Sequence, residues 1–197
     1  DIAGDKVLWE HKEESLIDSR GLAILEDDFF LYCPDKHFRC LDRKTGDEKW
    51  TTNEELTLEM IEEPGKGLTS TPGWRTQSMV VATPGALVVQ GQTRMNVIGV
   101  STEDGSMLWQ KSKVTNNPNA IYLDGSVILG IGERGAHVAV NPTSGEVEKE
   151  LKFLKRACTR LTACSDSLFV RGEGMLRFDR ETEKVRIDGA ARPACNE

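Results

Sequence analysis

The sequence predicts an all-β fold, a β-propeller in which each four-stranded antiparallel sheet forms one blade. A short polar motif recurs along the chain, and its turn positions are Asp5, Gly46, Gly105, Gly145 and Glu183, separated by 41, 59, 40 and 38 residues. A spacing of about 40 residues is typical of propeller repeats. Between the motifs, runs of β-favouring residues alternate with turn residues, as in consecutive hairpins. Together these observations predict about four blades.

The motif has its best copy between Asp42 and Trp50. Asp42 is suited to accept hydrogen bonds from the backbone N–H groups of the turn that follows it. Gly46 supplies the positive φ that a tight turn often needs. Trp50 follows Gly46 by four residues, as Trp109 follows Gly105. Because a large flat side chain repeated once per sheet suits packing between sheets, we expect the motif to join neighbouring blades.

The runs between the motifs support each blade in turn. Pro84-Gly85 in the second unit and Asp124-Gly125 in the third separate two β-rich runs, while an Asp-Asp pair and a Ser-Asp-Ser triplet do so in the first and fourth. Asp-Gly and Pro-Gly between such runs are strong hairpin signals. The blades are therefore expected over residues 15–52, 68–111, 113–152 and 155–188 of the 197-residue chain.

One stretch, residues 53–74, breaks the repeat with about 20 extra residues. Its start predicts a short helix that is capped at Asn53 and ends before Pro64. Insertions in repeat proteins map to loops on one face, which is often the binding face. We therefore take Trp74 and Arg75 as candidate contacts of a ligand or partner surface, with a decorative loop as the alternative interpretation.

The segment from Cys40 to Trp50 closely resembles the tryptophan-docking motif of PQQ-like, quinoprotein-type β-propellers, Ala-x-Asp-x-x-Thr-Gly-x-x-x-Trp, with Cys40 in place of Ala. The other copies are degenerate, and the fourth keeps only Asp179 and Thr182. The resemblance covers nearly the whole chain. It implies a structural blade-docking role for Trp9, Asp42, Thr45, Gly46, Trp50, Gly105, Trp109, Gly145 and Asp179.

The number of blades suggests part of a larger ring. Propellers of this family usually carry about seven or eight blades. Residues 5–11, which include Trp9, resemble the last strand of a preceding blade. The open blade faces are expected to be apolar and to associate with the remaining blades, with a protein partner or with a second copy of the chain. A closed four-bladed ring is the alternative.

The charge balance excludes some classes of partner. The net charge is −7, from 32 acidic and 25 basic residues, which argues against a surface for nucleic-acid phosphates. No apolar run of about 18 residues occurs, so no membrane span is expected. The first residues are polar, so we expect no signal peptide within this chain, and earlier removal of one is compatible with the sequence.

The C-terminal part is locally basic. Its arginines are Arg156, Arg160, Arg171, Arg177, Arg180, Arg186 and Arg192. An anion pocket near the ring axis is one interpretation of this group. A solvated rim that also includes Glu173, Glu181 and Glu183 is the favoured one.

The chain has five cysteines. In a hairpin centred on residues 36 and 37, Cys33 and Cys40 would face each other and could form a cross-strand disulfide. Cys158 or Cys164 could bridge to Cys195, and buried free thiols are the alternative for all of them. Cysteine usage and the family resemblance together favour an exported, oxidising compartment such as the periplasm.

No catalytic motif is recognisable. The chain lacks Cys-x-x-Cys-His, Cys-x-x-Cys and His-Glu-x-x-His, and His11, His37 and His137 are far apart in the sequence. Family members that are dehydrogenases hold pyrroloquinoline quinone (PQQ) and calcium and carry a disulfide between adjacent cysteines. This chain has no adjacent cysteines and no recognisable spacing for a calcium cage.

Two functions follow from these observations. The first is a non-catalytic scaffold or ligand- or protein-binding module in an exported bacterial protein, with no cofactor in this segment. The alternative is a fragment of a PQQ-dependent alcohol or sugar dehydrogenase, with PQQ and calcium as cofactors.

Overall fold

The computed structural model describes residues 4, 6–13, 21–33, 37–52, 54, 55, 57, 79–90, 96–112, 120–130, 137–153, 161–172 and 174–189. These residues form four antiparallel sheets of four strands each, in which strands adjacent in sequence are adjacent in the sheet. The all-β propeller prediction is therefore confirmed. Of the predicted insertion, the structure describes only residues 54, 55 and 57, and Glu55 and Thr57, at the start of the predicted helix, are helical. The rest of this helix, Trp74 and Arg75 lie outside the described residues.

Each blade is a simple meander. Blade 1 consists of β1 (Leu22–Leu25), β2 (Asp28–Cys33), β3 (His37–Asp42) and β4 (Glu48–Thr51). Blade 2 consists of β5 (Met79–Thr83), β6 (Ala86–Gln90), β7 (Val97–Ser101) and β8 (Met107–Lys111). Blade 3 consists of β9 (Ala120–Leu123), β10 (Ser126–Gly130), β11 (His137–Val140) and β12 (Val147–Leu151). Blade 4 consists of β13 (Thr162–Ala163), β14 (Ser167–Arg171), β15 (Met175–Asp179) and β16 (Val185–Asp188).

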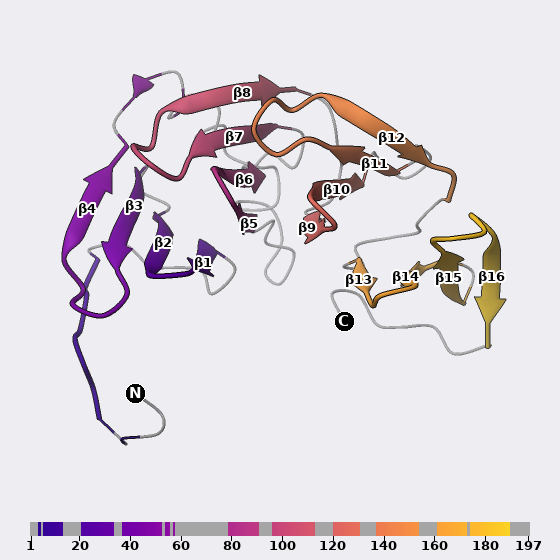
Figure 1. The fold of residues 1–197 in the computed structure, drawn as a ribbon, viewed down its shortest axis with the longest axis horizontal. Helices are drawn as coiled ribbons and strands as arrows, with labels where there is room; N and C mark the ends of the chain where they lie inside the picture. The colour runs from indigo at the N-terminus through magenta and orange to yellow at the C-terminus, as the bar shows by residue number, and fades with distance from the viewer. Residues whose placement is uncertain are drawn as a thin grey trace, which may run out of the picture.

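The blades follow one another along an arc (Figure 1). The first strands lie on its inner side, where β1 contacts β5, β5 contacts β9, and β9 contacts β13. The fourth strands β4, β8, β12 and β16 lie on the outer side. This radial arrangement brings the last strand of each blade next to the turn between the third and fourth strands of the following blade.

The predicted turn residues adopt the backbone conformations that their types favour. Asp124 and Gly125 both have positive φ, 50° and 85°, as a two-residue hairpin loop requires. Gly85, which follows Pro84, has a φ of 82°, in line with a Pro-Gly turn.

Buried apolar residues fill the space between successive blades. Phe30, Phe38 and Cys40 of blade 1 pack with Leu87 and Val100 of blade 2 in one cluster. A second cluster joins blade 2 to blade 3, and a third joins blade 3 to blade 4. Burial of these side chains, at about 25 cal/mol per Å² of apolar surface, is the main force holding the blades side by side.

The prediction of a Cys33–Cys40 disulfide is wrong. The register of β2 and β3 pairs Cys33 with His37 and Cys40 with Phe30, because the hairpin turns earlier in the sequence than the prediction assumed. Cys40 is a buried free thiol. Burial, followed by the charge of Asp28, raises its pKa to about 12.

The predicted bridge from Cys164 is also wrong, because Cys164 is an exposed free thiol. Cys158 and Cys195 lie outside the described residues. Over the part of the chain that the structure describes, there is no helix long and apolar enough to cross a membrane.

Candidate functional site: the interface between blades 3 and 4

The turn between the third and fourth strands is organised by one side-chain oxygen in every blade. In blade 1, Asp42 Oδ1 accepts the N–H groups of Lys44 and Thr45 at 2.8 and 3.0 Å. In blade 4, Asp179 Oδ1 accepts the N–H and hydroxyl groups of Thr182 at 2.8 and 2.7 Å. These bonds, led by the backbone N–H donors, lower the pKa of both aspartates.

Blades 2 and 3 achieve the same turn without a charge. Ser101 Oγ accepts the N–H of Glu103 at 3.1 Å, and Asn141 Oδ1 accepts those of Thr143 and Ser144 at 3.0 and 3.1 Å. The motif therefore needs an acceptor at this position rather than a carboxylate.

Three tryptophans donate a hydrogen bond to the turn between the third and fourth strands of the blade that follows them in the sequence. Trp9 Nε1 donates to the carbonyl of Arg43 at 2.9 Å. Trp50 of β4 donates to Thr102 at 3.1 Å, and Trp109 of β8 donates to Pro142 at 2.8 Å. In each case the acceptor immediately follows the first residue of the turn motif.

Each of these indole rings lies flat against a glycine of the turn. A Cβ atom built on Gly46 would lie 2.7 Å from the Trp9 ring, and one on Gly145 would lie 2.6 Å from the Trp109 ring. Gly105 is equally close to Trp50. All three glycines also have positive φ. The glycine thus meets two requirements, a left-handed backbone and room for the ring.

The interface between blades 3 and 4 lacks the pair of a tryptophan and a glycine. Lys149 occupies the docking position on β12, opposite Ala139, after the same register shift that precedes Trp50 in blade 1. Glu183 replaces the glycine and keeps a positive φ of 55°. Lys149 Nζ lies 2.5 Å from Glu183 Oε1, and this hydrogen bond lowers the pKa of Glu183. A Trp–Gly contact has become a Lys–Glu ion pair.

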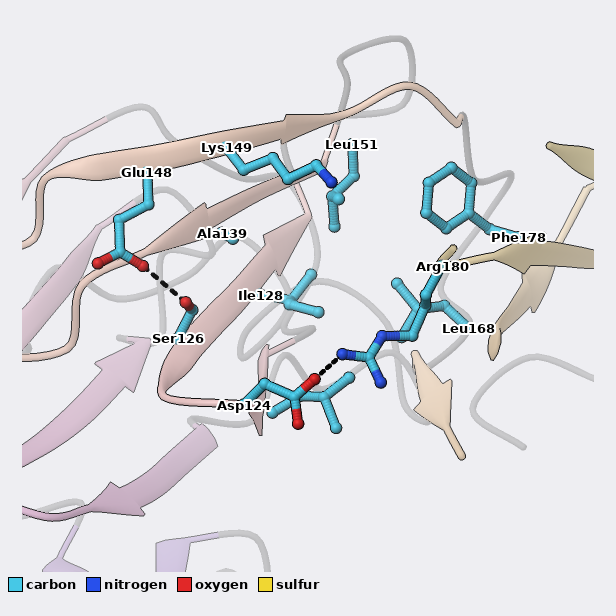
Figure 2. A pocket seen from close by; sticks show the side chains of 11 residues that line it. Asp124, Ser126, Ile128, Ala139, Glu148, Lys149, Leu151, Leu168, Phe178 and Arg180 are labelled. Carbon is cyan, nitrogen blue, oxygen red and sulfur yellow. Dashed lines mark hydrogen bonds and ion pairs between the residues drawn. The ribbon is translucent and has the colours of Figure 1, made fainter. Parts of the chain in front are cut away.

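A cavity of about 180 Å³ lies at this same interface (Figure 2). Its apolar wall comes from both blades and is buried, with Leu168 and Phe178 each only 1% exposed. The lining residues are Leu123, Asp124, Ser126, Ile128, Ala139, Glu148, Lys149, Leu151, Leu168, Phe178 and Arg180. The sequence did not predict this cavity. The sequence does carry one sign of it, because Lys149 and Glu183 replace both the tryptophan and the glycine of the same docking pair.

Four polar residues of the cavity lining are paired with one another, while Lys149 pairs with Glu183 outside the lining. Arg180 of blade 4 forms an ion pair with Asp124 of blade 3 and also donates to the carbonyl of Ser165 at 2.5 Å. Ser126 donates to Glu148 at 2.6 Å. Figure 2 shows these two contacts on different sides of the apolar wall. Since Asp124 is 68% and Lys149 50% exposed, the polar residues form a solvent-facing rim.

Two histidines have structural positions. His37 Nδ1 donates to the carbonyl of Thr52 at 2.9 Å, and His137 Nδ1 donates to that of Phe153 at 3.2 Å. Each ring thereby ties the start of a third strand to the chain that leaves the fourth.

No group of three or more His, Cys, Asp or Glu residues that could hold a metal ion occurs among the residues that the structure describes.

The outward face of blade 4 carries arginines, with the apolar Phe169 and Met175 and the acidic Asp179 beside them. Leu168 and Phe178 belong to the cluster shared with blade 3, so alternate residues of these strands point away from it. On that outward face, Arg177 pairs with Phe169 on one side and lies directly opposite Arg186 on the other. Over the described residues, this open face is therefore mixed, whereas the sequence led us to expect an apolar one. Arg177 forms an ion pair with Asp166 at 3.5 Å, Arg180 forms one with Asp124, and Arg186 is exposed, which agrees with the interpretation of these arginines as a solvated rim.

The geometry as a whole defines a propeller module of the PQQ-like repeat class, with tryptophan docking between blades. A family model described as "Outer membrane protein assembly factor BamB" matches residues 1–121. The chain therefore belongs to this family. A comparison with curated protein sequences gave no match.

Solved structures share the fold at low sequence identity. BamB from Moraxella catarrhalis is 16% identical with a TM-score of 0.65, over 94% of this chain and 54% of that chain. The computationally designed Ika8 protein is 15% identical with a TM-score of 0.58, over 87% and 48%. The designed Ika4 protein is 12% identical with a TM-score of 0.55, over 93% and 99%. The chain thus spans about half the length of the Moraxella catarrhalis protein.

Proposed function

We propose that the chain is a non-catalytic propeller module that binds a protein partner, within a periplasmic or otherwise exported bacterial protein. The outward face of blade 4 carries this proposal. Arg177 and Arg186 lie directly opposite each other, where like charges destabilise a sheet, and the partly exposed ion pair of Arg177 with Asp166, at 3.5 Å, offsets little of this repulsion. An acidic partner surface would remove this repulsion, and Phe169 beside the pair supplies the aromatic contact that interfaces favour.

The distribution of titratable groups also supports binding rather than catalysis. The lowered pKa values of Asp42, Asp104, Asp166 and Asp179 come mainly from hydrogen bonds within four separate turns. Catalytic groups with shifted pKa values are usually gathered in one cleft. The family description, which names an assembly factor, agrees with a polypeptide partner. That partner is a separate protein, the remaining blades of a larger ring or a second copy of this chain.

The test is an anisotropy titration with a labelled peptide rich in glutamate and tyrosine. We expect saturable, salt-sensitive binding that Arg186→Glu weakens by about tenfold. Lys184→Glu is the matched control, since it makes the same charge change at an exposed position of the same hairpin. Equal weakening by the two variants would contradict the proposal. Light scattering of the chain alone shows whether a second copy is the partner.

The alternative function, a fragment of a PQQ-dependent alcohol or sugar dehydrogenase, has its own test. Calorimetric titration with PQQ in calcium buffer should give no binding heat for the folded chain. Stoichiometric binding at micromolar or tighter affinity would support the dehydrogenase interpretation and count against the scaffold.

A further inference from the structure

The cavity between blades 3 and 4 occupies the place where other interfaces of this chain hold an indole ring. At the interface between blades 2 and 3, Trp109 fills this place and is only 9% exposed. At the interface between blades 3 and 4 the docking residue is Lys149, whose amine forms an ion pair with Glu183. The three tryptophans that the structure describes are each engaged at another interface. The cavity is therefore the space that a docking ring would fill.

The size and chemistry of the cavity suit a single aromatic group. An apolar cavity of roughly 150 Å³ lined by Leu, Ile and Phe takes up benzene in another protein. This cavity is slightly larger, about 180 Å³, and its buried wall includes Ile128, Leu168 and Phe178. A planar ring somewhat larger than benzene matches that volume.

A hydrogen-bond acceptor is expected at the edge of the cavity. The turn of blade 4 closes with the same backbone bond as that of blade 1, from Asp179 N to Lys184 O at 2.9 Å and from Asp42 N to Asp47 O at 2.8 Å. Arg180, which lines the cavity, thus corresponds to the residue whose carbonyl accepts from Trp9 in blade 1. A ring that carries an N–H donor could use this carbonyl.

The charges of the lining favour a neutral ligand. Asp124 and Glu148 contribute two negative charges, and Lys149 and Arg180 contribute two positive charges, so the sum is zero. Arg180 is already bound to Asp124, and Lys149 to Glu183. An ionic ligand would have to break one of these pairs and leave its partner uncompensated.

From these observations we propose that the cavity binds a neutral, planar aromatic group of the indole type with an N–H donor. The group belongs either to a free small molecule or to a tryptophan side chain of a partner polypeptide. This site is independent of the outward face of blade 4, and its test does not depend on that face.

Two probes, indole and a blocked Gly-Trp-Gly peptide, test the proposal by NMR-detected titration of the folded chain. We expect at least one to bind saturably, at roughly millimolar affinity or tighter. Binding of the peptide at least as tight as that of indole assigns the site to a polypeptide. Binding of indole alone assigns it to a free ligand. Absence of saturable binding by both probes would overturn the proposal.

A double variant locates the binding. Lys149→Trp with Glu183→Gly rebuilds the docking pair, fills the cavity from within, and should weaken probe binding by at least about tenfold. Lys152→Trp is the matched control, because it adds a tryptophan at an exposed position outside the cavity lining and should leave the affinity unchanged. Unchanged binding by the double variant would also refute the assignment. Thermal unfolding of both variants establishes that they are folded.

Discussion

The interface between blades 2 and 3 and the interface between blades 3 and 4 solve the same packing problem differently. In the first, Trp109 covers Gly145 and donates to the next turn at 2.8 Å. In the second, Lys149 and Glu183 form a partly exposed ion pair beside a cavity. Both turns close with the same backbone hydrogen bond, from Asn141 N to Glu146 O and from Asp179 N to Lys184 O at 2.9 Å in each, so this closure does not require the ring. The docking residues therefore determine whether a cavity remains between two blades, while the turn determines where the blades meet.

The largest expected difference is in the free energy of unfolding that is lost when the docking residue is replaced by alanine. Trp109→Ala should lower the free energy of unfolding by about 3–5 kcal/mol, because it removes a buried ring and leaves a cavity. Lys149→Ala should cost much less, since exposed ion pairs contribute little. Urea denaturation of both variants measures this difference. Similar costs would mean that the two interfaces are not energetically distinct.

The next effect concerns the glycine under the ring. Gly145→Ala should cost about 2–4 kcal/mol, because the added Cβ meets Trp109 and the residue must keep a φ of 71°. Gly125→Ala is the control, with a φ of 85° and no atom within 4 Å of the added Cβ. It should cost only about 1 kcal/mol for the left-handed backbone. If both variants lost the same stability, the ring would not be in contact with the glycine.

A smaller effect should appear on acidification. The hydrogen bond from Lys149 lowers the pKa of Glu183 below its ordinary value of 4.5. A lowered folded-state pKa gives a stability contribution that is present above pH 4.5 and is lost as the pH falls through the folded-state value. Glu183→Gln should therefore reduce the loss of thermal stability below pH 4.5.

Among the residues that the structure describes, no ion pair joins blade 2 to blade 3 beside Trp109. Trp109→Phe, which keeps an aromatic ring there, serves as the control and should leave the acid dependence as in the wild type. A Glu183→Gln variant with undiminished acid sensitivity would show that the ion pair is not formed in solution.

The smallest expected effect concerns the rates at which two cysteines are alkylated. Cys40 lies in the packed cluster between blades 1 and 2, and burial raises its pKa to about 12, so alkylation under native conditions should be slow. Cys164 is exposed and should react first. Peptide mapping after timed treatment with iodoacetamide checks the order. Early modification of Cys40 would indicate that the interface docked by Trp50 opens readily.

Much of the fold was predictable from the sequence because it depends on local patterns. The period of the motif and turn signals such as Asp124-Gly125 predicted four blades of four strands. The pairing of Cys33 with Cys40 was mispredicted because hairpin register depends on where the turn begins, and a small error there shifts every cross-strand pair.

The cavity could not be predicted from any single copy of the motif. Its residues extend from Leu123 to Arg180 and come from two blades, so it is visible only once those blades are packed together. The outward face of blade 4 depends in the same way on which side of the sheet Arg177 and Arg186 share.

The most direct test of the central claim is a double-mutant cycle in urea with Lys149→Trp, Glu183→Gly and both together. Lys149→Trp alone should not stabilise the protein, because the introduced ring would meet the Cβ of Glu183. Glu183→Gly alone removes the ion pair. The double variant should unfold at a higher urea concentration than the wild type, and the changes in the free energy of unfolding caused by the two substitutions should be strongly non-additive. Simple additivity of the two single changes would contradict the claim that this interface is a docking site lacking its ring.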